Sequence, residues 1–369
     1  MARLAWLTPG YPPDRGGVSD HSQAMVNELR ALGHDVLVCS NPHERGFRHL
    51  NTELSAFQPD VVVVAYVPLG FAPRTGGLSP EFTFWCARLA TRFRASTVLL
   101  AHEVNVPPDY HWRRRELKLT LLGLAQIAQF EVLARVFDCV VFSHQGSLDI
   151  WKKRLPGRRL HAVRICSSVK PVASEDPTAE LKAAGYFVPA KTILFFGSGH
   201  DSVLFDYVEA AFVEVSKIEP RAQLVIIGMD ATALRRRRPT LADFAPSVQT
   251  LGFVPEREVS LWLQASELVL APLVEGVNAR KTTVMAALQH GRAVVTTNGI
   301  YTRGDIPWAD ICALAPMDRA AFAAMAVACF QDATWRAKLG LSAQADYDAN
   351  AAARVTAAQL VSYAQISDR

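Results

Sequence analysis

A short stretch in the second half of the chain combines a carboxylate, a glycine and two cations in front of a predicted helix. Glu275 and Gly276 follow an apolar, strand-like segment, and Arg280 and Lys281 stand directly before a helix expected over 282–289. A helix N-terminus already carries partial positive charge, so two further cations are costly there unless an anion binds. Two cations with free helix amides suit a diphosphate, and a carboxylate accepts hydrogen bonds from sugar hydroxyls. The alternative is an ordinary solvated surface turn.

Two glycine-containing loops are further candidates for binding phosphate. Gly16-Gly17 follows the first predicted strand, where glycine lets the backbone approach a ligand, and Ser19 is a candidate N-cap for the next helix. Gly197-Ser198-Gly199 follows a later strand, where backbone amides would cradle an anion. Neither loop is the G-x-G-x-x-G dinucleotide fingerprint, and either could be an ordinary turn.

One histidine has a comparable position in the first half of the chain. His102 directly follows the segment 96–101, which reads as a buried strand. Ligands of parallel sheets bind beyond the carboxyl ends of the strands, so His102 is a candidate for ligand contact. A structural histidine with satisfied hydrogen bonds is the alternative that remains open.

Two other charged clusters have simpler explanations than ligand binding. Asp346-Tyr347-Asp348 has the spacing of a metal-binding D-x-D, but it lies in an alanine-rich helical tail, away from any strand end. The run from Arg235 to Arg238 is expected to be the exposed face of a helix. Because no convincing acidic pair occupies a strand end, we predict no metal site.

Length and composition restrict the class of protein. The chain has 369 residues, half of them apolar, which fills two domain cores, and its formal net charge of +4 does not indicate nucleic-acid binding. Six cysteines lie mostly in or beside apolar runs without C-x-x-C spacing, as expected for buried thiols of a reduced cytoplasmic protein. The N-terminus reads as a strand rather than a signal peptide, and no apolar run reaches the roughly 18–20 residues of a membrane span.

Apolar strands alternate with helices in both halves, which predicts two parallel sheets covered on both faces. The expected fold is therefore α/β, with two Rossmann-like domains facing a central cleft. A proline-containing segment at 167–191 reads as a linker. The expected domains are 1–175, 176–345 and a C-terminal helix over 346–369 that packs back on the first. The predicted strands are 3–8, 35–40, 60–66, 96–101, 138–143, 160–165, 192–196, 223–228, 248–251, 267–271 and 293–297, and the predicted helices include 19–32, 205–217, 256–265 and 282–289.

A basic stretch opens a leucine-rich helix in the first domain. Trp112, Arg113, Arg114, Arg115 and Lys118 stand at the head of a segment that is apolar nearly all round. A core helix with a solvated basic end is one interpretation. The other is a basic, apolar edge that rests on an anionic membrane surface.

The order and spacing of several short motifs resemble the GT-B fold retaining glycosyltransferases of family 4, over nearly the whole chain. The motifs that carry the resemblance are Pro9-Gly10-Tyr11-Pro12-Pro13, Gly16-Gly17-Val18, Leu32-Gly33-His34, Ala101-His102-Glu103, Phe196-Gly197, Leu251-Gly252-Phe253-Val254-Pro255, Glu275-Gly276 and Ala286-Ala287-Leu288 with Gly291.

The resemblance implies a nucleotide-sugar donor held mainly by the second domain and an acceptor in the first. It implies that Gly16-Gly17 approaches the donor phosphates, that His102 contacts the transferred sugar and that Glu275 binds sugar hydroxyls. Together with the charge argument for Arg280 and Lys281, the predicted catalytic residues are His102, Glu275, Arg280 and Lys281. The resemblance and the position of the loops and of the helix start together predict the donor-binding residues Gly16, Gly17, Gly197, Ser198, Gly199, Gly252, Phe253, Val254, Gly276, Asn278, Thr282 and Thr283.

The sequence departs from the family pattern at the second motif glutamate, which holds the ribose. Thr283 stands eight positions after Glu275, and an alignment on Gly291 places Ala286 there instead. The usual Arg and Lys after the first strand of the second domain are also missing. Arg280 and Lys281 would substitute for them from the other side of the diphosphate.

These observations predict a metal-independent, retaining, hexosyltransferase-type enzyme without a cofactor. Its partners would be a nucleoside-diphosphate sugar and a glycan or lipid-linked acceptor of polysaccharide or cell-envelope synthesis, without nucleic acid. The expected location is cytoplasmic, at the inner face of the cell membrane if the basic helix binds it. The alternatives are a non-catalytic nucleotide- or glycan-binding regulatory protein and a GT-B-like sugar-nucleotide epimerase.

Overall fold

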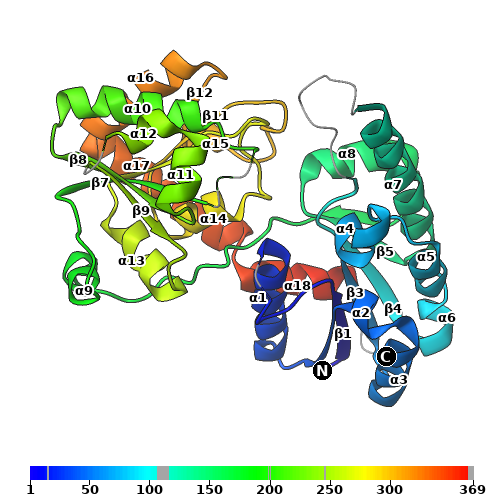
Figure 1. Ribbon diagram of the computed structural model, residues 1–369. Coiled ribbons are helices and arrows are strands. Elements are labelled where there is room, and N and C mark those ends of the chain that lie inside the picture. Colours follow the sequence, from blue (N-terminus) through cyan, green and yellow to red (C-terminus); the bar gives the residue numbers. More distant parts are fainter. Residues whose placement is uncertain (15, 106–115, 198, 200, 245–246, 365–369) are drawn as a thin grey trace. The chain divides into compact units, whose positions relative to one another are not determined.

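The computed structural model describes residues 1–14, 16–105, 116–197, 199, 201–244 and 247–364. The chain divides into two compact units. Unit 1 comprises Met1–Cys166 and Ala353–Arg369, and unit 2 comprises Ser167–Ala352. Each unit has one six-stranded sheet with helices packed on it (Figure 1).

The sheet of unit 1 is parallel throughout, in the order β2-β1-β3-β4-β5-β6. Its central strand β3 (Val61–Tyr66) is buried at every position because both faces of the sheet are covered. The remaining strands are β1 (Arg3–Thr8), β2 (Asp35–Ser40), β4 (Ser96–Ala101), β5 (Cys139–Phe142) and β6 (Leu160–Ala162).

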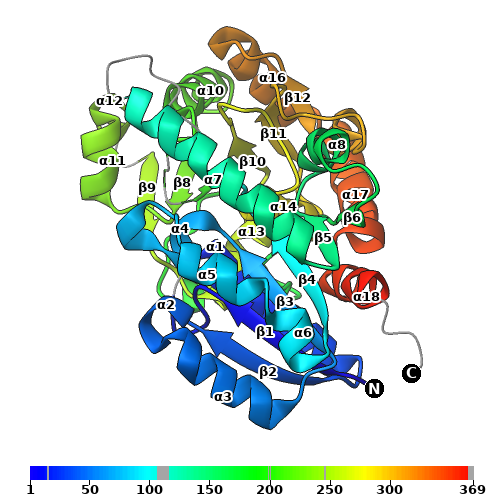
Figure 2. The same cartoon turned by 90° about the vertical axis from the view of Figure 1, so that its right-hand side faces the viewer.

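Two hydrophobic clusters cover the two faces of this sheet. One cluster joins the strands to α3, α5, α6, α7 and α8, and α5, α6 and α7 are drawn in front of the strands in Figure 2. The other joins the strands to α1 and α18. The helices of unit 1 are α1 (Gly17–Ala31), α2 (Pro42–Arg45), α3 (Phe47–Phe57), α4 (Pro68–Phe71), α5 (Pro80–Cys86), α6 (Leu89–Phe93), α7 (Glu116–Val136), α8 (Gln145–Arg154) and α18 (Ala353–Tyr363), with a 3-10 turn at Pro73–Thr75.

The sheet of unit 2 is also parallel, in the order β12-β11-β10-β7-β8-β9. Its strands are β7 (Lys191–Phe196), β8 (Ala222–Ile227), β9 (Val248–Gly252), β10 (Leu268–Ala271), β11 (Val294–Thr297) and β12 (Ala313–Ala315). Its helices are α9 (Pro177–Ala183), α10 (Phe205–Ile218), α11 (Ala231–Arg237), α12 (Pro239–Ala242), α13 (Glu256–Ala265), α14 (Thr282–Gln289), α15 (Trp308–Ile311), α16 (Arg319–Gln331) and α17 (Ala333–Asn350).

The unit boundaries differ from the predicted domain limits of 175/176 and 345/346. The segment after Cys166 belongs to unit 2 because its backbone bonds there: Val172 N–H donates to Ser260 Oγ at 3.0 Å. Ser260 Oγ in turn lies 2.8 Å from His290 Nε2, just after α14. The predicted linker also contains a helix, α9, because the Asp176 carboxylate caps it by accepting from Ala179 N–H.

The helical tail splits between the units. α17 ends at Asn350 in unit 2, where the Tyr347 hydroxyl accepts a hydrogen bond from Ser167 N–H at 2.9 Å. α18 packs on α1 in unit 1, with Ala357 and Leu360 buried in the same cluster as the residues of that helix. The helix that returns to the first unit therefore begins at Ala353 rather than at residue 346.

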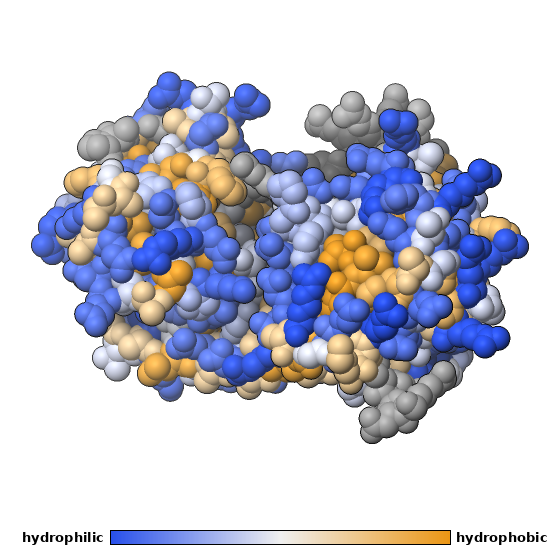
Figure 3. Space-filling model, turned by 90° about the horizontal axis from the view of Figure 1, so that it is seen from below, coloured by the Kyte–Doolittle hydropathy of each residue, from blue (hydrophilic) through white to orange (hydrophobic). Residues whose placement is uncertain are grey.

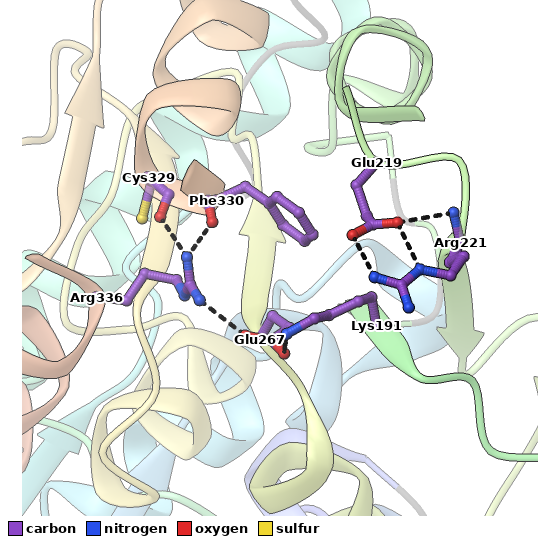
Figure 4. Close-up of polar contacts among 7 residues, drawn as sticks. All are labelled: Lys191, Glu219, Arg221, Glu267, Cys329, Phe330 and Arg336. Carbon is purple, nitrogen blue, oxygen red and sulfur yellow. Dashed lines mark hydrogen bonds and ion pairs between the residues drawn. The ribbon is translucent and has the colours of Figure 1, made fainter. Parts of the chain in front are cut away.

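An ion-pair network fastens the amino edge of the unit 2 sheet (Figure 4). Glu267 precedes β10 and accepts from Lys191 Nζ at 2.7 Å through Oε1 and from Arg336 Nη2 at 2.8 Å through Oε2. Arg336 also donates to the carbonyl oxygens of Cys329 and Phe330 at the end of α16. The network thereby ties β7, β10, α16 and α17 together.

The burial of the cysteines agrees with the sequence-based expectation. All six cysteines are buried, and none forms a disulfide. None of the helices in the described ranges is both long enough and apolar enough to cross a membrane. Figure 3 shows a face on which hydrophilic residues predominate and apolar residues gather in separate patches.

Candidate functional site

The loop between β10 and α14 is folded tightly against the end of β11. Gly276 adopts a positive φ of 80°, and a Cβ there would lie 2.3 Å from Gly299 N and 2.4 Å from Thr302 Oγ1. The next residue, Val277, donates its N–H to Thr297 O at 3.0 Å. Only glycine combines this backbone conformation with this close approach, so Gly276 fixes the direction in which Glu275 leaves the strand.

Glu275 is the buried carboxylate of this loop, with a side chain only 8% exposed. Its carbonyl oxygen accepts from Tyr301 N–H at 2.9 Å, which holds its backbone against the segment after β11. Arg280 Nη2 lies 3.6 Å and Lys281 Nζ 3.9 Å from the same carboxylate oxygen, Oε2. The three charged groups that the sequence singled out therefore form one cluster.

The backbone of Arg280 is held by a hydrogen bond, whereas its side chain keeps one nitrogen without a hydrogen-bond partner among the described residues. Its N–H donates to the Oδ1 of Asn278 at 3.1 Å, and Asn278 is itself only 1% exposed. The Arg280 guanidinium lies 5.7 Å from the centre of the Tyr301 ring. Its buried Nε has no hydrogen-bond partner among the described residues. A buried donor without a partner is unfavourable, so this guanidinium retains a hydrogen bond to give.

The start of α14 is uncapped, as the sequence predicted. Lys281 is the N-cap residue, no side chain accepts from the first turn, and that turn contains no acid. The structure places the Glu275 carboxylate near both cations, whereas the sequence analysis treated Glu275 as a separate ligand contact. At 3.6 and 3.9 Å the carboxylate is too far from either cation for a direct hydrogen bond, and the uncapped helix N-terminus itself favours an anion.

The first turn of α14 lies beside the end of β7. A Cβ added to Gly197 would lie 3.9 Å from Thr283 Cγ2, and Thr282 and Thr283 are both half-buried. Gly199 packs on Met229, because a Cβ there would lie 2.4 Å from the Met229 sulfur. Ser198 falls outside the described residues.

The end of β9 carries the remaining candidates of unit 2. Gly252 has a positive φ of 63° and donates its N–H to Met229 O at 3.0 Å. Phe253 is 71% exposed, whereas Val254 is buried. Because β10, β7, β8 and β9 are neighbours in a parallel sheet, the candidate residues after three of these strands lie along one edge of unit 2.

The glycine loop of unit 1 precedes α1 as predicted, but its cap differs. Gly16 is the N-cap, with φ 139° and nothing within 4 Å of an added Cβ, and Gly17 is the first helical residue. Ser19 is therefore wrong as the N-cap: it lies inside the helix and its hydroxyl donates to Asp14 O at 2.6 Å. The open space around Gly16 leaves room for a ligand at the start of α1.

His102 lies at the carboxyl end of β4, where the sequence placed it. Its backbone N–H donates to Tyr66 O at 3.0 Å, and its carbonyl accepts from the Ser143 hydroxyl at 3.1 Å. The ring is half-buried, and its enclosed Nε2 has no hydrogen-bond partner among the described residues. Burial lowers the pKa of His102 to about 4, so the imidazole is neutral at pH 7.

Sequence reasoning missed two residues at these edges. Tyr301 follows β11 and contacts Arg280, and a search for polar residues beyond each strand end would have found it. His21 packs its ring against His102, with ring centres 4.9 Å apart, and no local sequence signal indicates this pairing.

The other charged clusters are separate from these edges. Asp346 and Asp348 lie on α17 two residues apart, so their side chains do not face each other, and Asp346 accepts from Asn350 Nδ2. Within the described ranges, no group of three or more His, Cys, Asp or Glu side chains could hold a metal ion.

The arginine run at the end of α11 is only partly an exposed face. Arg235 and Arg236 are exposed. Arg237 Nη1 lies 2.8 Å from an oxygen of Asp201, and Arg238 Nε lies 3.2 Å from an oxygen of Glu209. The basic stretch Trp112, Arg113, Arg114, Arg115 lies outside the described residues, as does the side chain of Lys118.

One family model matches part of the chain. Residues 190–332, which lie in unit 2, match the family model described as "Glycosyl transferases group 1". The match covers less than half of the chain. No curated protein matches the sequence.

Solved structures resemble the whole chain at low sequence identity. Sucrose-phosphate synthase from Thermosynechococcus elongatus is 14% identical, with 98% of each chain covered and a TM-score of 0.75. WaaG, a glycosyltransferase involved in lipopolysaccharide biosynthesis, is 13% identical, with 99% of this chain and 100% of that one covered and a TM-score of 0.67. Anabaena HepE in complex with UDP-glucose is 13% identical, with 98% and 100% covered and a TM-score of 0.62. The chain has the two-Rossmann-unit GT-B fold of these proteins.

Proposed function

We propose that the chain is a retaining glycosyltransferase that moves a sugar from a nucleoside-diphosphate donor to a glycan or lipid-linked acceptor. The observation that carries the proposal is the cluster of Glu275, Arg280 and Lys281 at the start of α14. The match of residues 190–332 to a glycosyltransferase family and the GT-B fold support it.

In this proposal unit 2 binds the donor through its strand-end residues. Arg280, Lys281 and the first amides of α14 hold the diphosphate and stabilise the negative charge that develops as it leaves. Glu275 accepts hydrogen bonds from hydroxyls of the sugar. The backbone of Gly252, Phe253 and Val254 holds the base. The protein itself supplies the positive charge, so transfer requires no metal ion and no cofactor.

Unit 1 contributes the acceptor side. His102 contacts the transferred sugar, and the amides of Gly16 and Gly17 approach the donor phosphates. A neutral imidazole suits this role because it offers one hydrogen-bond donor and one acceptor to uncharged hydroxyls. No carboxylate nucleophile is assigned, and the leaving phosphate assists the acceptor on the same face of the sugar.

The nucleotide is the open specificity question. Either Thr283 or, in the alignment on Gly291, Ala286 stands where the family places a ribose-binding glutamate, and of the two only the half-buried Thr283 offers a hydroxyl. UDP is the first nucleotide to test because solved structures of similar fold hold UDP or UDP-glucose. Weak discrimination between ribose and deoxyribose donors is expected from a single hydroxyl.

A lipid-linked acceptor at the inner face of the cell membrane is a further part of the proposal. Within its described part, α7 exposes Leu121 and Leu124 by 57% and 58%, one turn apart on one side of the helix. Sedimentation with anionic vesicles at low salt tests this part. Binding that weakens when Leu121 and Leu124 are changed to serine supports it, and protein that stays in solution points to a soluble acceptor.

The central experiment incubates the protein with UDP-, GDP-, ADP- and dTDP-sugars and measures release of nucleoside diphosphate, with and without cell-derived acceptors. Release that survives EDTA supports a metal-independent transferase, and the anomeric configuration of the product, read by NMR, reports retention. Binding without turnover identifies a regulatory binder. Conversion to an epimeric donor identifies an epimerase.

A further inference from the structure

His21 is a buried histidine whose polar atoms are unsatisfied. It lies on the second turn of α1 with 1% exposure, and neither ring nitrogen has a hydrogen-bond partner among the described residues. Burial and the nearby His102 lower its pKa well below the usual value, so the ring is neutral at pH 7. Two unsatisfied nitrogens in the interior are unfavourable, and an apolar side chain would fill the space without that cost. The position therefore calls for a functional explanation.

The ring of His21 lies against the ring of His102. The two imidazoles meet edge to face, with centroids 4.9 Å apart and planes at 81°. The backbone of His102 is fixed by hydrogen bonds to Tyr66 and Ser143, but its enclosed Nε2 makes none among the described residues. Hydrogen bonds thus hold the backbone of His102, and its ring is in edge-to-face contact with the ring of His21.

α1 gives His21 a rigid base and links it to the glycine loop. His21 follows Gly17 by four residues, so both lie on one face of the helix, one turn apart. Next to His21, the Ser22 hydroxyl lies 2.9 Å from the Thr8 hydroxyl at the end of β1, which anchors the helix to the sheet. The His21 ring therefore stands between the start of α1 and the end of β4.

We propose that His21 is a positioning residue for His102: it fixes the plane of the His102 imidazole at the carboxyl end of β4, so that the ring meets the hydroxyl groups of a bound sugar. The inference rests on the proposed function, since contact between His102 and the sugar belongs to that proposal. His21 itself does not touch the sugar.

Two substitutions at residue 21 separate positioning from chemistry. His21→Ala removes the ring and is expected to lower kcat about 10- to 100-fold, with a smaller change in the KM for donor, because misplacing one catalytic group costs about that much. His21→Phe keeps a ring edge against His102 and is expected to recover most of kcat. The control is His161→Ala, which removes an imidazole stacked on Tyr363 elsewhere in unit 1 and should leave kcat unchanged.

A double-mutant cycle tests whether His21 acts through His102. Once His102 is alanine, His21→Ala should lower kcat no further, because the group that it positions is gone. Independent, multiplicative losses would contradict the proposal. So would a His21→Phe variant as impaired as His21→Ala, because the His21 nitrogens would then be required, and so would an unchanged kcat in His21→Ala.

NMR of the imidazole protons keeps the inference testable if no donor turns over, an outcome that would count against the proposed function alone. The His102 ring protons should be displaced from free-histidine positions by the neighbouring ring. The displacement should persist in His21→Phe and be lost in His21→Ala, while the amide spectrum shows both variants folded. Unchanged His102 signals in His21→Ala would overturn the proposal independently of any activity.

Discussion

Unit 2 contains two carboxylates that each face one arginine and one lysine, at opposite edges of the same sheet. At the amino edge, Glu267 receives Lys191 at 2.7 Å and Arg336 at 2.8 Å, one cation on each oxygen. At the carboxyl edge, both cations approach one oxygen of Glu275, at 3.6 and 3.9 Å. Both contacts of Glu267 are direct hydrogen bonds. At Glu275 the distances between the cation nitrogens and the carboxylate oxygen are too long for direct hydrogen bonds. Arg280 Nε also has no hydrogen-bond partner within the described chain.

The difference contrasts a structural ion pair with the binding site that we propose. Direct bonds to both oxygens of Glu267 hold four elements together and leave that carboxylate satisfied, as Figure 4 shows. Looser contacts at Glu275 leave donor capacity beside a helix N-terminus, where an anion is favoured. The same residue types therefore serve stability at one edge and, in our proposal, ligand binding at the other.

Among single substitutions, the largest expected effect on transfer comes from exchanging the Glu275 carboxylate for an amide. Glu275→Gln should lower transfer about 10- to 150-fold, because a hydrogen bond to a charged group contributes about 1.5–3 kcal/mol. Affinity for the bare nucleoside diphosphate should hold or improve, since the cations lose a competing anion. Kinetics and calorimetry measure the two quantities.

Glu267→Gln is the matched control for this prediction. It should leave turnover unchanged and lower the free energy of unfolding by about 1–3 kcal/mol, since one half-buried charged partner of a network is lost. Denaturant unfolding measures the loss. If both variants lose activity equally, or both lose only stability, the distinction between the two edges is wrong.

The stabilities of two glycine-to-alanine variants test whether the close packing of Gly276 is needed next to Glu275. Gly276→Ala should destabilise the protein by about 2–4 kcal/mol, from left-handed backbone strain together with overpacking against Gly299. Gly252→Ala has a similar positive φ but nothing within 4 Å, so it should cost only about 1–2 kcal/mol. Equal midpoints in urea would show that the close approach at Gly276 is not needed.

The smallest expected effect is a loss of stability at acid pH that arises from the neutral histidines His21 and His102 of unit 1. Burial depresses the pKa of His21 and His102 in the folded state, so the unfolded chain binds protons first. Stability is therefore lost as the pH falls below about 6.5, by about 1 kcal/mol per pH unit for each ring. His21→Phe removes one of these losses, so its stability should fall less than that of the wild type between pH 7.5 and pH 5. An identical fall in both proteins would contradict the burial of a neutral His21.

The sequence predicted most of the fold because buried parallel strands are continuous apolar runs. β1, β2 and β4 begin and end where the apolar segments do. β12 was missed because Ala-Leu-Ala is too short to show a pattern, and four-residue helices such as α2 and α15 are below the length at which helical periodicity is visible.

The sequence singled out individual candidate residues, but it did not predict which of them contact each other. Strand-end position singled out Glu275 and His102, and the structure places each at the carboxyl ends of the strands of its own unit, while their roles stay predictions. The convergence of Arg280 and Lys281 on Glu275 depends on the fold-back at Gly276, which no spacing in the sequence reveals. The contact between His21 and His102 joins residues 81 positions apart, beyond the reach of any local pattern.

The most direct test of the central claim is calorimetric titration of UDP, GDP, ADP and dTDP into the wild type and into the Arg280→Ala/Lys281→Ala double variant. Two charged hydrogen bonds at about 1.5–3 kcal/mol each predict a loss of at least about 100-fold for the preferred diphosphate, decreasing with added salt. Arg235→Ala/Arg236→Ala, which removes two exposed cations from α11, is the matched control and should bind as the wild type does. If the Arg280→Ala/Lys281→Ala variant binds the diphosphate with unchanged affinity, the cluster at the start of α14 is not the donor site.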